Sequence, residues 1–423
     1  MKNIRSGELI VIRSESKKEY WAAVCFYVFW FTQMFCKGMG MIADSKLYRL
    51  LSLASLGFLG LKYLLTDWDF RSLVIVSCVL FVGALSYLLS DMMAWFLACL
   101  MICGAKGIDL KKLFLYTLYV RGTLFLCTVS LAVFGVVGKM PYETGFRTDT
   151  FELFRAIENV FKYLAMSAED RVLFGLSLKG TYYRYELGFG EANLAHGNLL
   201  MIVLLYVFVR KNKLNVLECV GISLANFIVY YWTFSRTGLI LVFFVLAMSL
   251  LLRVARLKKI FYAFGSFVFI ACLLFSVLLA YTADFDVGEQ MTWWEWVCQK
   301  LDSLLTTRLR LSAYAAQSFP CYYIFGARFR SGWNMLDSAY MNYWLRFGFV
   351  SCIIMTYAYT KRMEDCKKDD DLSLFLMLFI MALYGLTEMA FYSITTNFFL
   401  LTLRDVIYPE PNNSYSLNAG VTA

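Results

Sequence analysis

Long apolar runs recur every ~20 to 35 residues along the chain, and this rhythm restricts the folds available to it. A helix of about 20 apolar residues spans the ~30 Å hydrocarbon core of a bilayer. Hydrophobic residues make up 60% of the 423 residues and charged residues only 17%, more apolar surface than a soluble domain can bury. We therefore expect an all-α fold, a polytopic membrane helical bundle of about twelve transmembrane helices that forms one integral membrane domain over residues 1–423.

Short polar turns separate most of the predicted spans, and two connections are much longer. The spans are expected at residues 20–36, 47–65, 73–89, 92–103, 113–137, 192–209, 216–234, 239–252, 260–281, 336–358, 372–387 and 389–403. One hairpin or a longer re-entrant fold is the alternative for 372–403. The long connections cover 138–191 and 282–335, and each contains apolar residues at helical spacing. We expect amphipathic helices there, over 151–166 and 291–311, and a disordered tail over 409–423.

Prolines lie outside every predicted span, at Pro141, Pro320, Pro409 and Pro411. Transporter helices that are broken near the bilayer midplane usually show proline or glycine interruptions. We therefore expect unbroken spans, which disfavours a small-solute permease.

Lysine and arginine gather near the amino-terminus and in alternate short connections, which predicts the orientation of the chain. The basic groups are Arg13, Lys17 and Lys18; Lys106, Lys111 and Lys112; Arg210, Lys211 and Lys213; Arg253, Arg256, Lys258 and Lys259; and Lys361, Arg362, Lys367 and Lys368. The positive-inside rule places these connections and both termini in the cytoplasm and the two long connections outside, as external loops. The net charge of +9 is spread over many loops, so no nucleic-acid partner is expected.

Several arginines lie on the predicted outer face, where basic residues are otherwise sparse. Arg236 lies between two apolar runs, and the second long loop contains Arg308, Arg310 and Arg328. A guanidinium binds phosphate through two parallel hydrogen bonds and stays charged at any working pH, so these residues fit a diphosphate-linked lipid. The alternative is that they reach toward lipid headgroups without a specific ligand.

Two further arginines, Arg121 and Arg346, fall within predicted spans. A charged side chain at this depth is costly and is expected to face the interior of the bundle or a wet cavity. It can hold an anionic headgroup or brace the helices, and the pattern favours neither.

Carboxylates and one histidine complete the candidate chemistry. Asp337 opens a span and Glu388 lies where two apolar runs meet, so each is a candidate for catalysis or for pairing with the arginines. Glu191 precedes another span and is a weaker candidate. His196, the only histidine, is a candidate base near a helix end, or a hydrogen-bonding residue between packed helices.

Metal and cofactor sites are not expected from these patterns. Most of the 12 cysteines lie in apolar runs, and no metal-ligand spacing occurs. Asp284 and Asp286 imitate the acidic pair by which sugar transferases hold a metal and a nucleotide sugar, but the predicted topology places them outside, away from nucleotide sugars.

An ordered set of short motifs covers roughly residues 186–397. Leu187-Gly-Phe-Gly-Glu-Ala-Asn193 precedes a span, and Ser-Arg-Thr-Gly follows at 235–238. Arg308 or Arg310 leads through the long loop to Phe-Gly at 325–326. The closing positions are Asp337, Ser338, Tyr340, Gly348, Glu388 and Asn397. In its order this set resembles the Wzy-type polysaccharide polymerases, although Ala192 stands where many relatives carry proline and the helix after Arg308 lacks the usual tryptophan.

The resemblance implies a glycosyltransferase that polymerises undecaprenyl-diphosphate-linked oligosaccharide repeat units into O-antigen or capsular polysaccharide. It implies an enzyme of the bacterial cytoplasmic (inner) membrane that works at the outer face without metal or cofactor. Its partners would be the lipid-linked substrate, membrane lipids, and the chain-length regulator and flippase of the same cell-envelope pathway. The catalytic candidates are Asp337, Glu388 and His196, and the substrate-binding candidates are Arg236, Arg308, Arg310, Arg328, Asn193 and Tyr340.

Two alternatives come from the same pathway. An O-antigen ligase carries a histidine in its long outer loop, whereas His196 lies outside that loop here. A lipid-linked oligosaccharide flippase is expected to have short loops around a charged central cavity.

Overall fold

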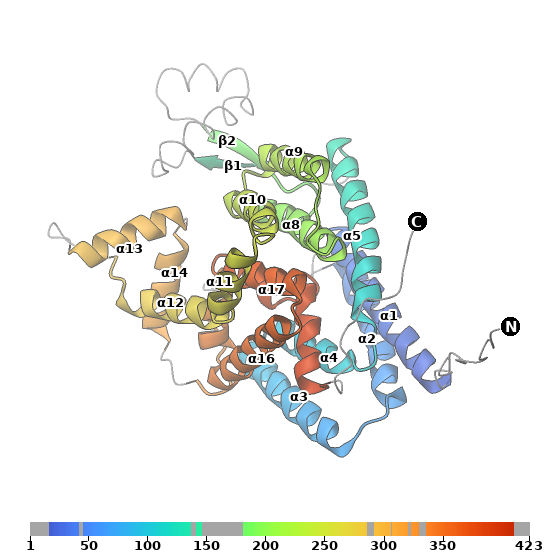
Figure 1. The fold of residues 1–423 in the computed structure, drawn as a ribbon. Coiled ribbons are helices and arrows are strands. Elements are labelled where there is room, and N and C mark those ends of the chain that lie inside the picture. Colours follow the sequence, from blue (N-terminus) through green and yellow to red (C-terminus); the bar gives the residue numbers. More distant parts are fainter. Residues whose placement is uncertain are drawn as a thin grey trace.

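The computed structural model describes residues 17–41, 45–136, 141–145, 181–285, 292–305, 307–319, 323–329 and 336–409. Helix accounts for 78% of the structure, which confirms that the fold is mostly helical (Figure 1). Within the described ranges one small element departs from the all-α expectation. Strands β1 (Pro141–Gly145) and β2 (Thr181–Tyr185) pair antiparallel beside the end of α9 (Val216–Thr233).

Five predicted spans are helices that are long and apolar enough to cross a membrane. They are α2 (Lys46–Leu65), α3 (Phe70–Ser90), α5 (Leu110–Val133), α8 (Ala192–Val209) and α9. The predicted span 260–281 becomes α11 (Ala255–Gly265) and α12 (Val268–Thr282), which meet at a bend of 50°. Shorter apolar helices are α4 (Met93–Gly104), α10 (Arg236–Leu251) and α17 (Leu372–Tyr384), and the first predicted span lies in α1 (Lys17–Gly38).

Polar side chains fix where several of these helices begin. The carboxylate or amide oxygens of Asp69, Asp109 and Asn215 each accept a hydrogen bond from a backbone N–H of the first helical turn. Asn215 and Glu218 form a reciprocal capping box at the start of α9. Such caps satisfy backbone donors that have no partner within the helix, so they fix the helix ends in the sequence.

The second long connection contains two helices where one was expected. Helices α13 (Trp293–Leu304) and α14 (Arg308–Ser318) are separated at Thr307, whose backbone is left-handed with φ of 68°. Helix α14 packs on α12 at one side of the molecule (Figure 1). The helix expected at 151–166 and nearly all of the expected tail lie outside the described residues.

The expectation of unbroken spans is wrong for residues 336–358. This segment forms a short α15 (Ala339–Met341), a π-helical turn η1 (Asn342–Arg346) and then α16 (Phe349–Lys368) after a break at Gly348. Gly348 and Gly326 both have positive φ, +87° and +108°, and a Cβ on Gly348 would lie 2.3 Å from the Gly326 nitrogen. The backbone N–H of Ala327 donates to the carbonyl of Arg346 at 3.1 Å. Gly348 therefore interrupts this helix although no proline is present. The backbone N–H of Ala327 provides a partner for a carbonyl that the interruption leaves without one.

Residues 389–403 also differ from a single spanning helix, to which a hairpin or a re-entrant fold over 372–403 was the alternative. After α17 the chain forms two 3-10 turns, η2 (Met389–Tyr392) and η3 (Phe398–Leu403), with non-helical backbone between them, and ends in α18 (Arg404–Ile407). Asn397 lies in this interruption and donates from its amide to the carbonyl of Phe391 at 2.9 Å. Irregular backbone is tolerated in an apolar interior only when such partners satisfy its polar groups.

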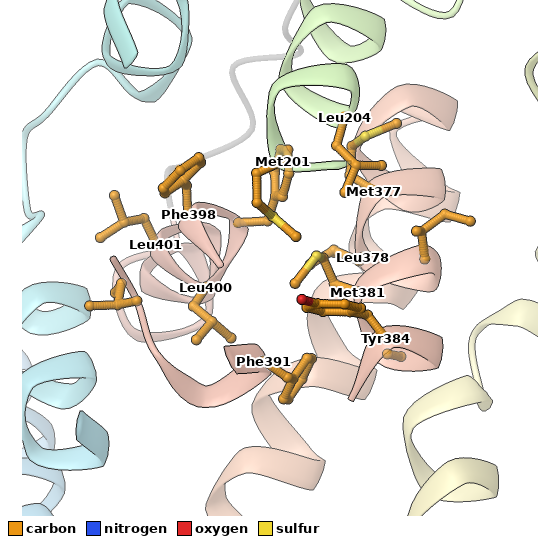
Figure 2. Close-up of a cluster of buried hydrophobic side chains, with 14 of the residues drawn as sticks. Met201, Leu204, Met377, Leu378, Met381, Tyr384, Phe391, Phe398, Leu400 and Leu401 are labelled. Atoms are coloured by element: carbon orange, nitrogen blue, oxygen red, sulfur yellow. The ribbon is translucent and has the colours of Figure 1, made fainter. Parts of the chain in front are cut away.

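These interrupted segments lie in the centre of the core. Met201 and Leu204 of α8 face Met377 and Met381 of α17, with Leu400 of η3 beside them (Figure 2). Almost every side chain of α17 and η3 is buried. The outer helices α2, α3 and α9 instead expose large apolar side chains over most of their length, as expected for surfaces that face lipid.

Side-chain contacts join many of the predicted cytoplasmic connections at one end of the bundle. Ion pairs link Lys106 with Asp69 at 3.1 Å, Lys258 with Asp370 at 2.6 Å and Arg362 with Asp405 at 3.0 Å. Other contacts join predicted outer connections. Arg328 pairs with Asp91 at 2.6 Å, and Gly40 is packed against the backbone of Gly188. Each of these contacts joins two connections that the prediction assigns to the same side of the membrane.

Gly348→Ala is expected to destabilise the folded chain by about 1–3 kcal/mol through backbone strain, with a further cost from the close approach to Gly326. Gly57→Ala in α2 is the control, because a Cβ there meets no neighbouring atom within 4 Å. Thermal unfolding of the detergent-purified proteins should show a lower midpoint for Gly348→Ala alone. Equal midpoints for both variants would contradict the proposed packing of the two glycines.

Candidate functional site

Arg308 joins two carboxylates that come from separate helix interruptions. Its Nε donates to Oδ2 of Asp337 and its Nη2 donates to Oε1 of Glu388, both at 2.8 Å. The Arg308 and Glu388 side chains are 12% and 10% exposed, whereas Asp337 is 35% exposed. The three side chains form the acidic cluster, which is open to solvent mainly at Asp337.

Arg308 is positioned by the reversal between α13 and α14. The buried carboxylate of Asp302 in α13 accepts a hydrogen bond from the backbone N–H of Arg310 at 2.8 Å, which anchors the first turn of α14. Arg310 also pairs through its side chain with Asp302 at 3.6 Å. The two neighbouring arginines therefore have different partners, and of the two it is Arg308 that joins the acidic cluster.

The two carboxylates are held by the interrupted backbone described above. Asp337 precedes Ser338, whose hydroxyl caps α15, and the N–H of Ala339 donates to the carbonyl of Gly385 at 2.9 Å. Glu388 follows the end of α17, and its N–H donates to the carbonyl of Tyr384 at 3.0 Å. The Ala339–Gly385 bond ties the two interruptions together, so Arg308 bridges a preformed pair.

Burial and charge give Glu388 an unusual affinity for protons. Burial raises the pKa of Glu388, the charge and hydrogen bond of Arg308 lower it, and the charge of Asp337 raises it; together these effects shift the pKa from 4.5 to about 7. Burial lowers the pKa of Arg308, but the two carboxylates raise it by more, so its pKa lies above the ordinary value. Near neutral pH the cluster therefore contains a permanent cation and a carboxyl that can take up or release a proton.

Glu191 extends this site, and sequence reasoning ranked it low. It caps α8, burial and the charge of Asp337 raise its pKa, and Arg308 and Arg184 oppose that rise. Buried Arg184 donates to Oδ1 of Asn193 at 2.9 Å and to the carbonyl of Thr233 at 2.8 Å. Asn193 thus holds an arginine beside the acidic groups. The sequence feature that pointed to Glu191 was its predicted position just before a helix.

His196 does not join the acidic cluster. It is fully buried, with Nε2 2.7 Å from Oδ1 of Asn226 and Nδ1 3.3 Å from the hydroxyl of Thr233. A Cβ on Gly238 would lie 2.4 Å from the ring, which explains the glycine of Ser-Arg-Thr-Gly. This geometry favours the hydrogen-bonding alternative for His196 over a role as catalytic base, because both ring nitrogens are engaged and no substrate atom can reach them.

The other predicted binding residues lie in different surroundings. Tyr340 is fully buried, and its hydroxyl donates to the carbonyl of Ala382 at 2.7 Å, so it joins α15 to α17 instead of facing a substrate. Exposed Arg328 is paired with Asp91, as described above. Arg236 is the first residue of α10 and is half-buried.

No group of three His, Cys, Asp or Glu side chains in the described part of the chain has the geometry of a metal site. Comparison of the sequence with protein-family models and with curated proteins, and of the fold with solved structures, finds no match.

The acidic cluster predicts how stability depends on pH. Because the folded-state pKa of Glu388 is raised, the folded chain binds more protons than the unfolded chain between about pH 4.5 and 7. The free energy of unfolding is therefore expected to fall as pH rises through this window. The decrease is at most a few kcal/mol, the free energy that corresponds to the pKa shift of Glu388. Glu388→Gln removes the titrating group and should flatten the profile, as measured by thermal unfolding from pH 5 to 8. A profile in Glu388→Gln as steep as that of the native chain would refute the assignment.

Proposed function

We propose that this chain is a membrane glycosyltransferase that joins lipid-diphosphate-linked oligosaccharide repeat units into a polysaccharide. One observation carries the proposal: a cation and two carboxylates meet at helix interruptions, and one of the carboxyls has a pKa near 7. A general base works best when its pKa lies near the working pH. The motifs that resemble Wzy-type polymerases supply the substrate class, since Asp337 and Glu388 both belong to them.

The reaction that fits these groups needs no redox partner. The acceptor hydroxyl attacks the anomeric carbon of the donor sugar, an acceptor C–O bond forms, and the bond to the lipid diphosphate breaks. Glu388, unprotonated in part near neutral pH, accepts the hydroxyl proton, and the diphosphate departs with the bonding electron pair. Arg308 keeps the two carboxylates together, and Asp337, the most exposed member, is placed to hydrogen-bond the acceptor.

The expected location is the outer face of a bacterial cytoplasmic membrane. Asp371 in the basic connection 359–371 caps the start of α17, whereas Glu388 follows the other end of this helix, and the positive-inside rule assigns the basic connections to the cytoplasm. An outward-facing site suits a substrate that already carries its leaving group, because activated nucleotide sugars are not required. The partners would then be the lipid-linked substrate, membrane lipids, and the flippase and chain-length regulator of the same pathway.

A second candidate function is transport of an anionic solute or lipid. It is favoured by the interruptions at Gly348 and at residues 385–388, because broken helices around buried charges are typical of transporter sites. An O-antigen ligase remains the alternative within the transferase class.

Glu388→Gln is expected to lower polymerisation at least about 100-fold, because a positioned proton acceptor contributes roughly 10²–10⁴-fold. In a strain that lacks the native gene, surface polysaccharide should then run on a gel as single repeat units. Glu364→Gln in α16, remote in sequence from the acidic cluster, is the matched control and should restore the full ladder.

Two results would exclude the proposed reaction. Full-length polysaccharide with Glu388→Gln would exclude a role for this carboxyl in catalysis. Accumulation of lipid-linked units inside the cell in the strain lacking the gene would instead support transport.

A further inference from the structure

Arg346 is a buried cation without a hydrogen-bonding or ionic partner among the described residues. It ends the π-helical turn η1 within the interrupted segment 336–368 and is only 3% exposed. Its Nε is buried and makes no hydrogen bond. Burying a guanidinium without an anion or an acceptor costs several kcal/mol, so such an arrangement is rarely kept without a use.

Four other arginines in the described ranges are equally buried, and each has acceptors. Arg362 pairs with Asp405, Arg404 donates to two backbone carbonyls, Arg184 donates to Thr233 and Asn193, and Arg121 donates to Met34 and Asn198. These contacts brace helices, which is the structural role that the sequence left open for Arg346. Arg346 shows none of them.

The Arg346 guanidinium packs over an aromatic ring. Its central carbon lies 4.4 Å from the centre of the Phe329 ring, and the Phe329 side chain is itself buried. Stacking on a ring occupies one face of a guanidinium and leaves its N–H groups, which point outward in the plane, free for an acceptor. The aromatic contact supplies no hydrogen-bond acceptor, so the Nε of Arg346 keeps an unused donor.

Tyr392 places a second unused donor beside this cation. It is 2% exposed, and its hydroxyl makes no hydrogen bond. Its ring packs against Phe347, the residue after Arg346, with centroids 5.0 Å apart. Both Arg346 and Asp337 lie within electrostatic range of its hydroxyl. The Tyr392 hydroxyl is thus close enough to interact electrostatically with both the Arg346 guanidinium and Asp337 of the acidic cluster.

We infer that Arg346 and Tyr392 bind a phosphate-class anion next to the acidic cluster. The inference rests on the proposed function, in which the anion is the diphosphate of the donor lipid. It also changes the expected role of Arg308. Because Asp337 and Glu388 already occupy two of its donors at 2.8 Å, Arg308 positions the carboxylates while Arg346 supplies charge for the leaving diphosphate.

The test uses the full chain purified in phosphatidylcholine nanodiscs, with inorganic pyrophosphate and farnesyl diphosphate as probes. Arg346→Gln removes the charge, and Tyr392→Phe removes only a hydroxyl from a buried ring. Their matched controls are exposed Arg256→Gln in α11 and exposed Tyr357→Phe in α16. Equilibrium binding of radiolabelled probe and the thermal unfolding midpoint without ligand are measured for each protein.

Binding is expected to weaken at least about tenfold in Arg346→Gln and several-fold in Tyr392→Phe, because hydrogen bonds to charged groups are the strong ones. Both controls should bind like the native chain. The ligand-free midpoint should rise in Arg346→Gln, since an uncompensated buried charge is removed, whereas loss of a bracing arginine would lower it. If Arg346→Gln does not fold, the fold of Tyr392→Phe is less at risk and its binding decides.

Native-like binding by both variants, no binding of either probe by the native chain, or a lowered ligand-free midpoint in Arg346→Gln would each overturn the inference. Tighter binding of farnesyl diphosphate than of pyrophosphate supports a lipid diphosphate as the ligand. The reverse order overturns that assignment and indicates a free anion. If Glu388→Gln makes full-length polysaccharide while Arg346→Gln still loses binding, the transferase proposal fails and the anion site stands.

Discussion

The contact on which the site depends is the bridge from Arg308 to Asp337 and Glu388. Asp337 precedes α15 and Glu388 follows α17, whereas Arg308 belongs to a separate helix, α14. Removing the cation would leave two carboxylates facing each other in a poorly hydrated place, where one of them would have to stay protonated. The bridge thus holds the two interrupted segments together and lowers the pKa of Glu388, which burial raises.

Interrupted helices require protection, and the arrangement of the bundle provides it. Backbone groups freed at residues 347–348 and 385–397 cannot face lipid without losing their hydrogen bonds. Helices α8 and α17 pack apolar side chains against η2 and η3 (Figure 2), and Phe347 is contacted by Ser86 of α3 and Trp95 of α4, while α2, α3 and α9 carry the surface that suits lipid (Figure 1). The regular outer helices therefore separate the irregular inner segments from lipid.

The regular helices could be predicted from sequence because a run of about 20 apolar residues has few other solutions in lipid. The break within 336–358 was not predicted, and for 372–403 a re-entrant fold was only an alternative to two spans. Apolar composition is equally high in α17 and in η3, and the break at Gly348 depends on a contact with Gly326, which is invisible to local pattern. Asp337, Glu388 and Arg308 were found because charges near lipid are conspicuous. Tyr340 and His196 were also singled out, and in the structure their polar atoms bond to neighbouring helices.

The two ends of the bundle use their buried arginines differently. At the basic end Arg362 pairs with Asp405, and Arg404 donates to the carbonyls of Ala105 and Ile108 between α4 and α5, so both arginines join neighbouring helices. At the opposite end Arg308 is satisfied by acids that can exchange protons, and Arg346 has no such acceptor within the described residues. Equal burial with unequal pairing is difficult to explain by stability alone, because a neutral side chain would pack at Arg346 with less desolvation. The asymmetry therefore favours a chemical function at that end.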